Sequence, residues 1–278
     1  MKRNCNIFNN YFAVYDDIMM DVEKEQVFCR NLSSLLKRAI FPTQKILGDN
    51  MIEMENVYKK YPNGVVAANG ISVQIKQGEF VYVVGPSGAG KSTFIKMMYR
   101  EEVPTKGSIT IDGINLAKMK ESRVPYLRRQ IGVVFQDFKL LPTLTVFENI
   151  AFAMEVIEEH PAQIKKRVME TLDLVGLKHK ARMLPTELSG GEQQRVSIAR
   201  SIVNSPKVVI ADEPTGNLDP ETSWDIMNIF DEINRTGTTV VMATHNKDIV
   251  NRIKHRVIAI ESGTISRDEQ RGDYGYEI

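Results

Sequence analysis

The chain has 278 residues, and its 36 basic and 35 acidic side chains leave a formal net charge of +1. This length allows one large domain, or a core domain that carries a subdomain. Because there is no basic excess of the kind that marks nucleic-acid-binding surfaces, we expect no nucleic-acid partner. No apolar run approaches the ~20 residues that cross a bilayer as a helix, which predicts that any membrane segment belongs to another chain. Both cysteines, Cys5 and Cys29, lie near the start of the chain, so we expect no disulfide in the rest.

Residues 1–50 differ in composition from the rest of the chain. A basic start followed by apolar residues resembles a targeting segment, but polar residues interrupt the apolar run and no small-residue cleavage site follows. Residues 33–40 are suited to a short basic amphipathic helix, which is a membrane-surface signal. We favour instead an N-terminal extension that is disordered or absent from the native protein, with the native chain beginning at Met51 or Met54.

Strand-like segments come next. Residues 52–75 predict short strands around the turn 62–64, whose sequence PNG is typical of a hairpin. Residues 80–84 are apolar and partly β-branched, which predicts a buried strand. Residues 107–112 and 131–135 add further strand-like pieces.

Residues 85–93 (GPSGAGKST) fit G-x-x-x-x-G-K-[ST], the loop that cradles nucleotide phosphates. They lie between a predicted strand and a segment that can continue as a helix, so the N–H groups at the helix start would point at the phosphates. Lys91 would bring its positive charge to the β- and γ-phosphates, and the Ser92 hydroxyl is placed to ligate Mg²⁺. The predicted phosphate-binding residues are Gly85, Pro86, Ser87, Gly88, Ala89, Gly90, Lys91, Ser92 and Thr93.

The segment from about residue 142 to residue 185 has a helical character. Within residues 162–175 the apolar side chains recur every three or four positions, and Gly176 is a plausible C-terminal cap. The apolar stripe of this helix is expected to belong to the core, with partner contacts confined to its exposed edge.

Two further apolar strands end in polar residues. Residues 208–211 are followed by Asp212 and Glu213, and residues 239–244 are followed by His245. Open α/β sheets bind ligands along the carboxyl edge of their strands. Asp212 is suited to hold Mg²⁺, Glu213 to polarise a water for attack on the γ-phosphate, and His245 to donate a hydrogen bond to that phosphate. Alone, an acidic pair is usually a solvated turn and a lone histidine is usually structural, but their shared position predicts ATP hydrolysis.

Residues 188–195 (LSGGEQQR) open a helical stretch at 195–203. Ser189, Gly190 and Gly191 at a helix start form a second anion-binding device. This stretch resembles the signature of the ATP-binding cassette (ABC) family, and the resemblance covers nearly all of residues 51–278.

The resemblance implies an α/β fold: a P-loop NTPase core of the ABC ATPase type, with an antiparallel β-subdomain and an α-helical subdomain at about 137–188. Tyr61 looks like the aromatic residue that stacks on adenine, and Gln136 like the glutamine that senses Mg²⁺ and the γ-phosphate. A plain strand aromatic and a solvated polar residue are the alternatives for these two. Residues 217–219 (NLD) match the loop that crosses between subunits, and His245 matches the switch histidine.

The same resemblance implies a homodimer with ATP at its interface. In the family, the signature of one subunit covers the ATP that the glycine-rich loop of the other subunit holds. A head-to-tail, two-fold symmetric pair with two ATP molecules follows from this arrangement. ATP would join the two subunits, and its hydrolysis would release them.

Within the ABC family, residues 132–142, 145–156, 211–220 and 242–246 closely resemble FtsE-type cell-division ATPases. Asn246 stands where many relatives carry an aspartate. The nearest alternative is the ATPase of a MacB-type or LolD-type exporter of lipoprotein, peptide or drug.

The FtsE-type resemblance implies a membrane partner that resembles FtsX and regulates cell-wall hydrolysis, with cell-division proteins as further partners. It places the chain on the cytoplasmic face of the cell membrane, at the division site. Phe138, Leu140 and Leu141 would supply apolar area for a helix of the partner, and Lys139 a charge to orient it. Because Leu140 and Leu141 could instead be core residues of the subdomain, Phe138 is the preferred single candidate.

Two other functional classes are alternatives. An ABC protein of ribosomes or DNA usually carries two cassettes or a long coiled-coil insert, and neither is present. A catalytically silent scaffold is opposed by the intact Lys91, Asp212, Glu213 and His245.

Overall fold

The computed structural model describes residues 50–275 of the chain. The expectation of a disordered or non-native extension therefore lies outside the described residues, apart from Asn50, which begins the first strand.

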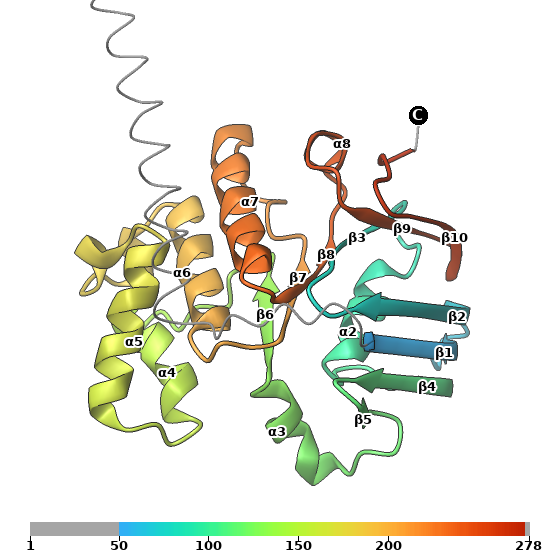
Figure 1. Cartoon of the computed structure of the whole chain (residues 1–278), viewed down its shortest axis with the longest axis horizontal. Helices are drawn as coiled ribbons and strands as arrows, with labels where there is room; N and C mark the ends of the chain where they lie inside the picture. Colours follow the sequence, from blue (N-terminus) through green and yellow to red (C-terminus); the bar gives the residue numbers. More distant parts are fainter. Residues whose placement is uncertain (1–49, 276–278) are drawn as a thin grey trace, which may run out of the picture.

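Ten strands are present in the described part of the chain (Figure 1). They are β1 (Asn50–Lys60), β2 (Val66–Lys76), β3 (Phe80–Val84), β4 (Lys106–Ile111), β5 (Ile114–Asn115), β6 (Ile131–Phe135), β7 (Val208–Asp212), β8 (Thr239–Ala243), β9 (Arg256–Glu261) and β10 (Thr264–Glu269). The α-helices are α2 (Lys91–Met98), α3 (Val124–Arg128), α4 (Val146–Glu155), α5 (Pro161–Leu174), α6 (Gly190–Ile202), α7 (Pro220–Arg235) and α8 (Lys247–Arg252). Short 3-10 helices lie at η1 (Glu121–Arg123), η2 (Lys178–Lys180) and η3 (Pro185–Glu187).

The larger sheet has six strands in the order β10-β9-β3-β8-β7-β6. All neighbouring pairs are parallel except β10 with β9. Asp212 at the end of β7 pairs with Ala243 at the end of β8. Since parallel strands end at one edge of a sheet, the residues that follow β3, β7 and β8 share that edge, which is where the sequence places the nucleotide.

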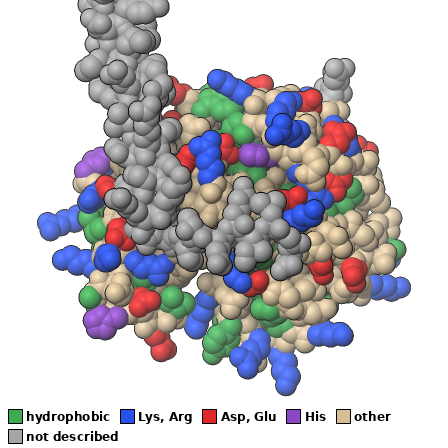
Figure 2. Space-filling model, viewed as in Figure 1, with side chains coloured by type: hydrophobic (Ala, Val, Ile, Leu, Met, Phe, Trp, Pro, Cys, Tyr) green, Lys and Arg blue, Asp and Glu red, His purple; other side chains and the backbone are tan. Residues whose placement is uncertain are grey.

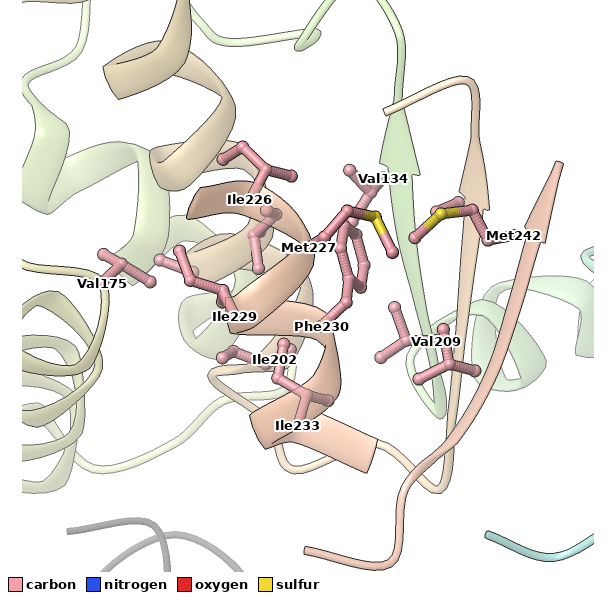
Figure 3. Packing of buried hydrophobic residues seen from close by; sticks show 14 of the residues in the cluster. Val134, Val175, Ile202, Val209, Ile226, Met227, Ile229, Phe230, Ile233 and Met242 are labelled. Carbon is pink, nitrogen blue, oxygen red and sulfur yellow. The ribbon is translucent and has the colours of Figure 1, made fainter. Parts of the chain in front are cut away.

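Both faces of this sheet are covered. Tyr82 and Val84 of β3 belong to one apolar cluster and Val81 and Val83 to another, because successive side chains of a strand point to opposite faces. A parallel strand buried on both faces is a continuous apolar run, as predicted for residues 80–84. On one face, Met227 and Phe230 of α7 point toward the sheet strands that carry Val134, Val209 and Met242 (Figure 3).

The smaller sheet is antiparallel and has the order β2-β1-β4-β5. The predicted hairpin around residues 62–64 is confirmed: Tyr61 N–H donates to the Val65 carbonyl at 2.9 Å, and Gly64 N–H donates to the Tyr61 carbonyl at 2.9 Å. Both strands are longer than the predicted pieces. This sheet lies beside α2 (Figure 1), and it matches the expected antiparallel β-subdomain.

Helices α4, α5 and α6 lie together, away from the smaller sheet (Figure 1). The predicted amphipathic helix is confirmed as α5, and Gly176 follows it with a φ of 73°, the left-handed conformation of a helix end. Helix α6 begins at Gly190, which confirms the helix start expected at Ser189–Gly191 and extends the stretch predicted for residues 195–203 toward its N-terminus. Ser189 caps the helix, and the Glu192 carboxylate accepts the Ser189 N–H. The limits of about 137–188 for a helical subdomain stay a prediction.

Candidate nucleotide-binding site

The glycine-rich loop connects β3 to α2 in a shape that requires glycine at two positions. Gly85 has a φ of 146°, and a Cβ there would lie 2.2 Å from the Ile260 carbonyl oxygen. Gly90 has a φ of 109°, and a Cβ there would lie 2.2 Å from the Ala67 carbonyl oxygen. Gly90 offers no side chain to cap α2, so the first N–H groups of the helix stay available to an anion.

Lys91 lies inside the curve of this loop. Its Nζ donates to the carbonyls of Gly85 at 2.8 Å and Pro86 at 3.0 Å. The ammonium group of Lys91 is thus held within the glycine-rich loop, where a phosphate oxygen could replace either carbonyl as its hydrogen-bond partner.

Tyr61 is brought to the same loop from the end of β1. Its hydroxyl lies 3.1 Å from Thr93 Oγ1, in the first turn of α2. The Nζ of Lys59 lies 4.9 Å from the centre of the Tyr61 ring, so the ring has a cation on its face. The structure thereby places Tyr61 beside the phosphate loop, and its stacking on adenine stays a prediction.

Asp212 lies at the end of β7, where burial and the neighbouring Glu213 carboxylate raise its pKa, opposed by Lys96, Lys91 and the Ser92 hydroxyl. Its Oδ1 is buried, and no polar group of the described residues accepts or donates to it. Such an atom calls for a partner, since buried polar atoms are nearly always paired. A carboxylate oxygen beside a serine hydroxyl fits Mg²⁺, which takes one or two protein carboxylates and completes its shell with phosphate and water. Among residues 50–275, no group of three or more His, Cys, Asp or Glu side chains is placed to hold a metal ion.

Glu213 and His245 meet across the neighbouring strands β7 and β8. Glu213 Oε2 lies 2.7 Å from His245 Nδ1 and also accepts the His245 backbone N–H at 3.2 Å. Glu213 has a φ of 50°, and a non-glycine residue in this conformation costs energy that active sites commonly tolerate. The structure therefore brings together two residues that lie 32 positions apart in the sequence.

Gln136 follows β6 at the same edge of the larger sheet, but its side chain contacts Asn217 and not the other two candidate Mg²⁺ ligands. Its Nε2 donates to Asn217 Oδ1 at 3.2 Å, and the Asn217 amide returns a bond of 3.2 Å to the Gln136 carbonyl. The side chain thus contacts the loop that follows Glu213 rather than Ser92 or Asp212, and its role toward Mg²⁺ stays a prediction.

The signature residues lie apart from the glycine-rich loop of their own chain. A Cβ on Gly190 would contact Leu218 and Phe138, and one on Gly191 would lie 2.3 Å from Thr222 Cγ2. Ser189 and Gly190 are exposed at the N-terminus of α6, whereas the glycine-rich loop packs on β2 and β9. The structure therefore does not unite the two predicted phosphate-binding devices within one chain.

Two residues of α6 that sequence reasoning missed connect the signature helix to the site. Gln194 Nε2 donates to the carbonyl of Pro214, just after Glu213, at 2.7 Å. Arg200 donates to the carbonyls of Phe138 at 2.9 Å and Lys139 at 2.7 Å, and burial lowers its pKa. Gln194 lies within the signature and could have been suspected from that position. No feature of the sequence distinguishes Arg200.

A family model described as "ABC transporter" matches residues 68–216. The Cell division ATP-binding protein FtsE of Bacillus subtilis (strain 168) is 74% identical over 225 residues, which are 81% of this chain and 99% of that protein. The chain belongs to the FtsE family of ABC transporter ATP-binding proteins. Similarity extends to FtsE of Mycobacterium tuberculosis, 52% identical over 82% of this chain and 99% of that protein, and of Escherichia coli (strain K12), 43% identical over 82% of this chain and 100% of that protein.

Solved structures agree with this family and with the predicted fold class. The ATP-binding cassette MJ0796, in a dimeric post-hydrolysis state bound to ADP and Pi, superposes with a TM-score of 0.73 at 35% identity, covering 80% of this chain and 99% of that chain. The cbiO1 subunit from Clostridium perfringens superposes with a TM-score of 0.75 at 31% identity, covering 81% and 90%. The P-loop core of the ABC ATPase type is therefore confirmed, and the similarity to FtsE proteins does not favour the exporter alternative.

Proposed function

We propose that this member of the FtsE family binds and hydrolyses ATP as a subunit of an FtsE–FtsX-type complex, on the cytoplasmic face of the cell membrane at the division site. There it would regulate cell-wall hydrolysis through its membrane partner. The observation that carries ATP hydrolysis is the pair of Glu213 and His245, hydrogen-bonded to each other at the carboxyl edge of the sheet. The FtsE proteins that are 43% to 74% identical to the chain support the cell-division role.

The phosphates would bind where the glycine-rich loop meets α2. Lys91 Nζ would exchange the carbonyls of Gly85 and Pro86 for β- and γ-phosphate oxygens. The new hydrogen bonds would be stronger, because phosphate oxygens carry negative charge and the carbonyl oxygens do not. Ser92, Asp212 and Gln136 would hold Mg²⁺, which when bound neutralises charge on the phosphates. Tyr61 would stack on the adenine.

Glu213 would accept the proton of the attacking water. In the structure, Glu213 Oε2 is hydrogen-bonded to the ring and to the backbone N–H of His245. For turnover, either this oxygen or the other carboxylate oxygen, Oε1, would have to face the attacking water. His245 would stabilise the charge that develops on the γ-phosphate. Its side chain is 60% exposed, which leaves the ring accessible to the nucleotide.

A homodimer with ATP at its interface would complete the site. Ser189 and Gly190 are exposed and lie apart from the glycine-rich loop of their own chain, so a second copy is needed to bring a signature to the bound nucleotide. The dimeric MJ0796 cassettes support this arrangement.

A membrane partner resembling FtsX would supply the membrane segments. In the part of the chain from residue 50 to residue 275, no helix is long and apolar enough to span a bilayer. Over the uncovered part of the face shown in Figure 2, acidic and basic side chains are interspersed. Other cell-division proteins are further candidates for the same assembly.

The segment after Gln136 is the candidate docking surface for this partner, but the side chains differ in exposure. Leu140 packs against the core, whereas Leu141 is 38% exposed. Phe138 is half-buried and its ring faces Gly190 of the signature. Leu141 is therefore the better candidate for a contact with the partner, and Phe138 for a contact inside the chain.

Co-purification with a membrane protein of the FtsX type tests the proposal. We expect the pair to copurify in detergent, and Leu141→Ala to reduce recovery about tenfold, the effect of losing ~1.4 kcal/mol of binding. Tyr126→Ala is the matched control, because Tyr126 is 53% exposed on α3. Failure of the wild-type pair to copurify would contradict the proposed complex, and undiminished recovery of the Leu141 variant would place the docking surface elsewhere.

A further inference from the structure

The segment at the C-terminal end of the described chain folds back against α8. Tyr274 is only 6% exposed and belongs to the core cluster that includes Ile249 and Val250 of α8. Its backbone N–H donates to Asn251 Oδ1 at 2.8 Å. The Nζ of Lys247 lies 5.7 Å from the centre of its ring. One tail residue thus contacts both ends of α8.

The tail is itself held by specific contacts. Arg267 of β10 donates to the carbonyls of Asp273 at 2.6 Å and Tyr274 at 2.9 Å. Asp273 forms an ion pair with Lys254, two residues after α8. Gly275 has a φ of 71°, and a Cβ there would lie 2.5 Å from both terminal nitrogens of Arg267. The left-handed backbone at this position favours glycine, whereas the Arg267 guanidinium ends a flexible side chain and could move away from a larger residue.

Helix α8 is directly connected to His245. Asn246 caps the helix, accepting the Ile249 N–H at 3.1 Å, and its own N–H donates to Thr244 Oγ1 at 3.1 Å. With six residues, α8 is far shorter than the ~12–15 residues at which isolated helices become even marginally stable in water. Its position must therefore come from tertiary contacts, and the tail supplies several of them.

We propose that the C-terminal tail positions His245 for ATP hydrolysis by holding α8 in place, with Tyr274 as the central positioning residue. This inference rests on the proposed function. The tail contacts α8, β9 and β10, so removing these contacts would affect catalysis more than ATP binding. A displacement of even 1 Å at a reacting group can cost about a hundredfold in rate.

The chain carries its own reporter for the position of α8. Trp224 on α7 is the only tryptophan of the chain, and the guanidinium carbon of Arg252, at the end of α8, lies 4.6 Å from the centre of its ring. A shift of α8 would change this contact and with it the fluorescence of Trp224. The reporter works whether or not ATP is hydrolysed.

The test compares Tyr274→Ala and Asn251→Ala in the full chain. We expect kcat to fall roughly tenfold to a hundredfold in Tyr274→Ala, and less in Asn251→Ala, while the Kd for ATP stays within about twofold. Trp224 emission should change in both. Asn251→Asp, which keeps an oxygen acceptor for the Tyr274 N–H, should restore kcat and emission toward wild type. Arg271→Ala is the control, because Arg271 is exposed in the same tail and takes part in none of these contacts.

Wild-type kcat and emission in both alanine variants would overturn the inference. Equal losses of ATP affinity and kcat would also overturn it, because a damaged fold gives that pattern and a displaced His245 does not. If Tyr274→Ala fails to fold, Asn251→Ala and Asn251→Asp decide on their own. A wild-type protein that does not hydrolyse ATP would instead refute the proposed function.

Discussion

Glu213 Oε2 and His245 Nδ1 are 2.7 Å apart, and the same oxygen accepts the backbone N–H of His245. Because a carboxylate accepts hydrogen bonds, Nδ1 is the donor in this contact and Nε2 is the ring nitrogen left to face a nucleotide. Glu213 Oε2 thus accepts two hydrogen bonds from His245, one from the ring and one from the backbone. These two bonds hold the proposed general base and the proposed γ-phosphate donor side by side at the edge of the sheet.

Substitutions in the glycine-rich loop and in the signature should affect different properties, namely ATP affinity and ATP-dependent dimerisation. Lys91→Ala removes the charge that would meet the phosphates, so we expect the affinity for ATP to fall at least tenfold. Ser189→Arg fills the exposed start of α6, so we expect normal ATP affinity and no ATP-dependent dimer. Equilibrium binding of a fluorescent ATP analogue and size-exclusion chromatography measure the two effects.

The control for Ser189→Arg must separate a blocked interface from a lost helix cap. Ser189 and Thr145 each form a capping box, with Glu192 and Glu148, and the loss of such a cap costs about 1 kcal/mol. Thr145→Arg should therefore lower stability to a similar degree and still dimerise. Equal loss of ATP binding in the Lys91 and Ser189 variants would contradict the shared site.

Asp212 should lower stability in the absence of nucleotide and Mg²⁺. Its pKa is raised in the folded protein by burial and by Glu213, so the folded state binds a proton more tightly than the unfolded state. The charged form therefore costs stability at any pH above the raised pKa, and stability falls as pH rises through the interval between the unfolded and folded pKa values. Asp212→Asn should raise Tm at pH 8 by a few degrees and abolish hydrolysis. The gain in Tm should shrink as pH falls through that interval, and a gain independent of pH would contradict this explanation.

The first strand distinguishes the two expected start sites. Met51 is 3% exposed and Ile52 is fully buried, and β1 pairs with β4 at Ile52 and Glu53. A chain that begins at Met51 keeps these contacts and should match the full chain in Tm and ATP binding. A chain that begins at Met54 loses two buried apolar side chains, which costs about 3–6 kcal/mol. Thermal unfolding measures the difference, and equal Tm values would show that the start of β1 contributes no stability.

Local patterns predicted most of what the structure shows. The loop at residues 85–93, the strand before it and the hairpin at 62–64 could be predicted because each depends on residues that are close together in the sequence. The start of α6 at Ser189–Gly191 was predicted from a local pattern too, and Ser189 and Glu192 also have the spacing of a capping box. Sequence alone placed Glu213 and His245 at one edge, but not in contact, because their hydrogen bond depends on the register of β7 with β8. The contacts of Tyr274 depend on tertiary packing in the same way.

Trapping of an ATP-bound dimer by Glu213→Gln tests the central claim most directly. If Glu213 is the general base, this variant should bind ATP normally and hydrolyse it about 10²–10⁴ times more slowly. With ATP and Mg²⁺ it should then elute as a stable dimer in size-exclusion chromatography, whereas wild type returns to monomer as ATP is consumed. Glu170→Gln on α5 is the control and should behave as wild type. Normal turnover by Glu213→Gln, or a monomer despite bound ATP, would contradict the account.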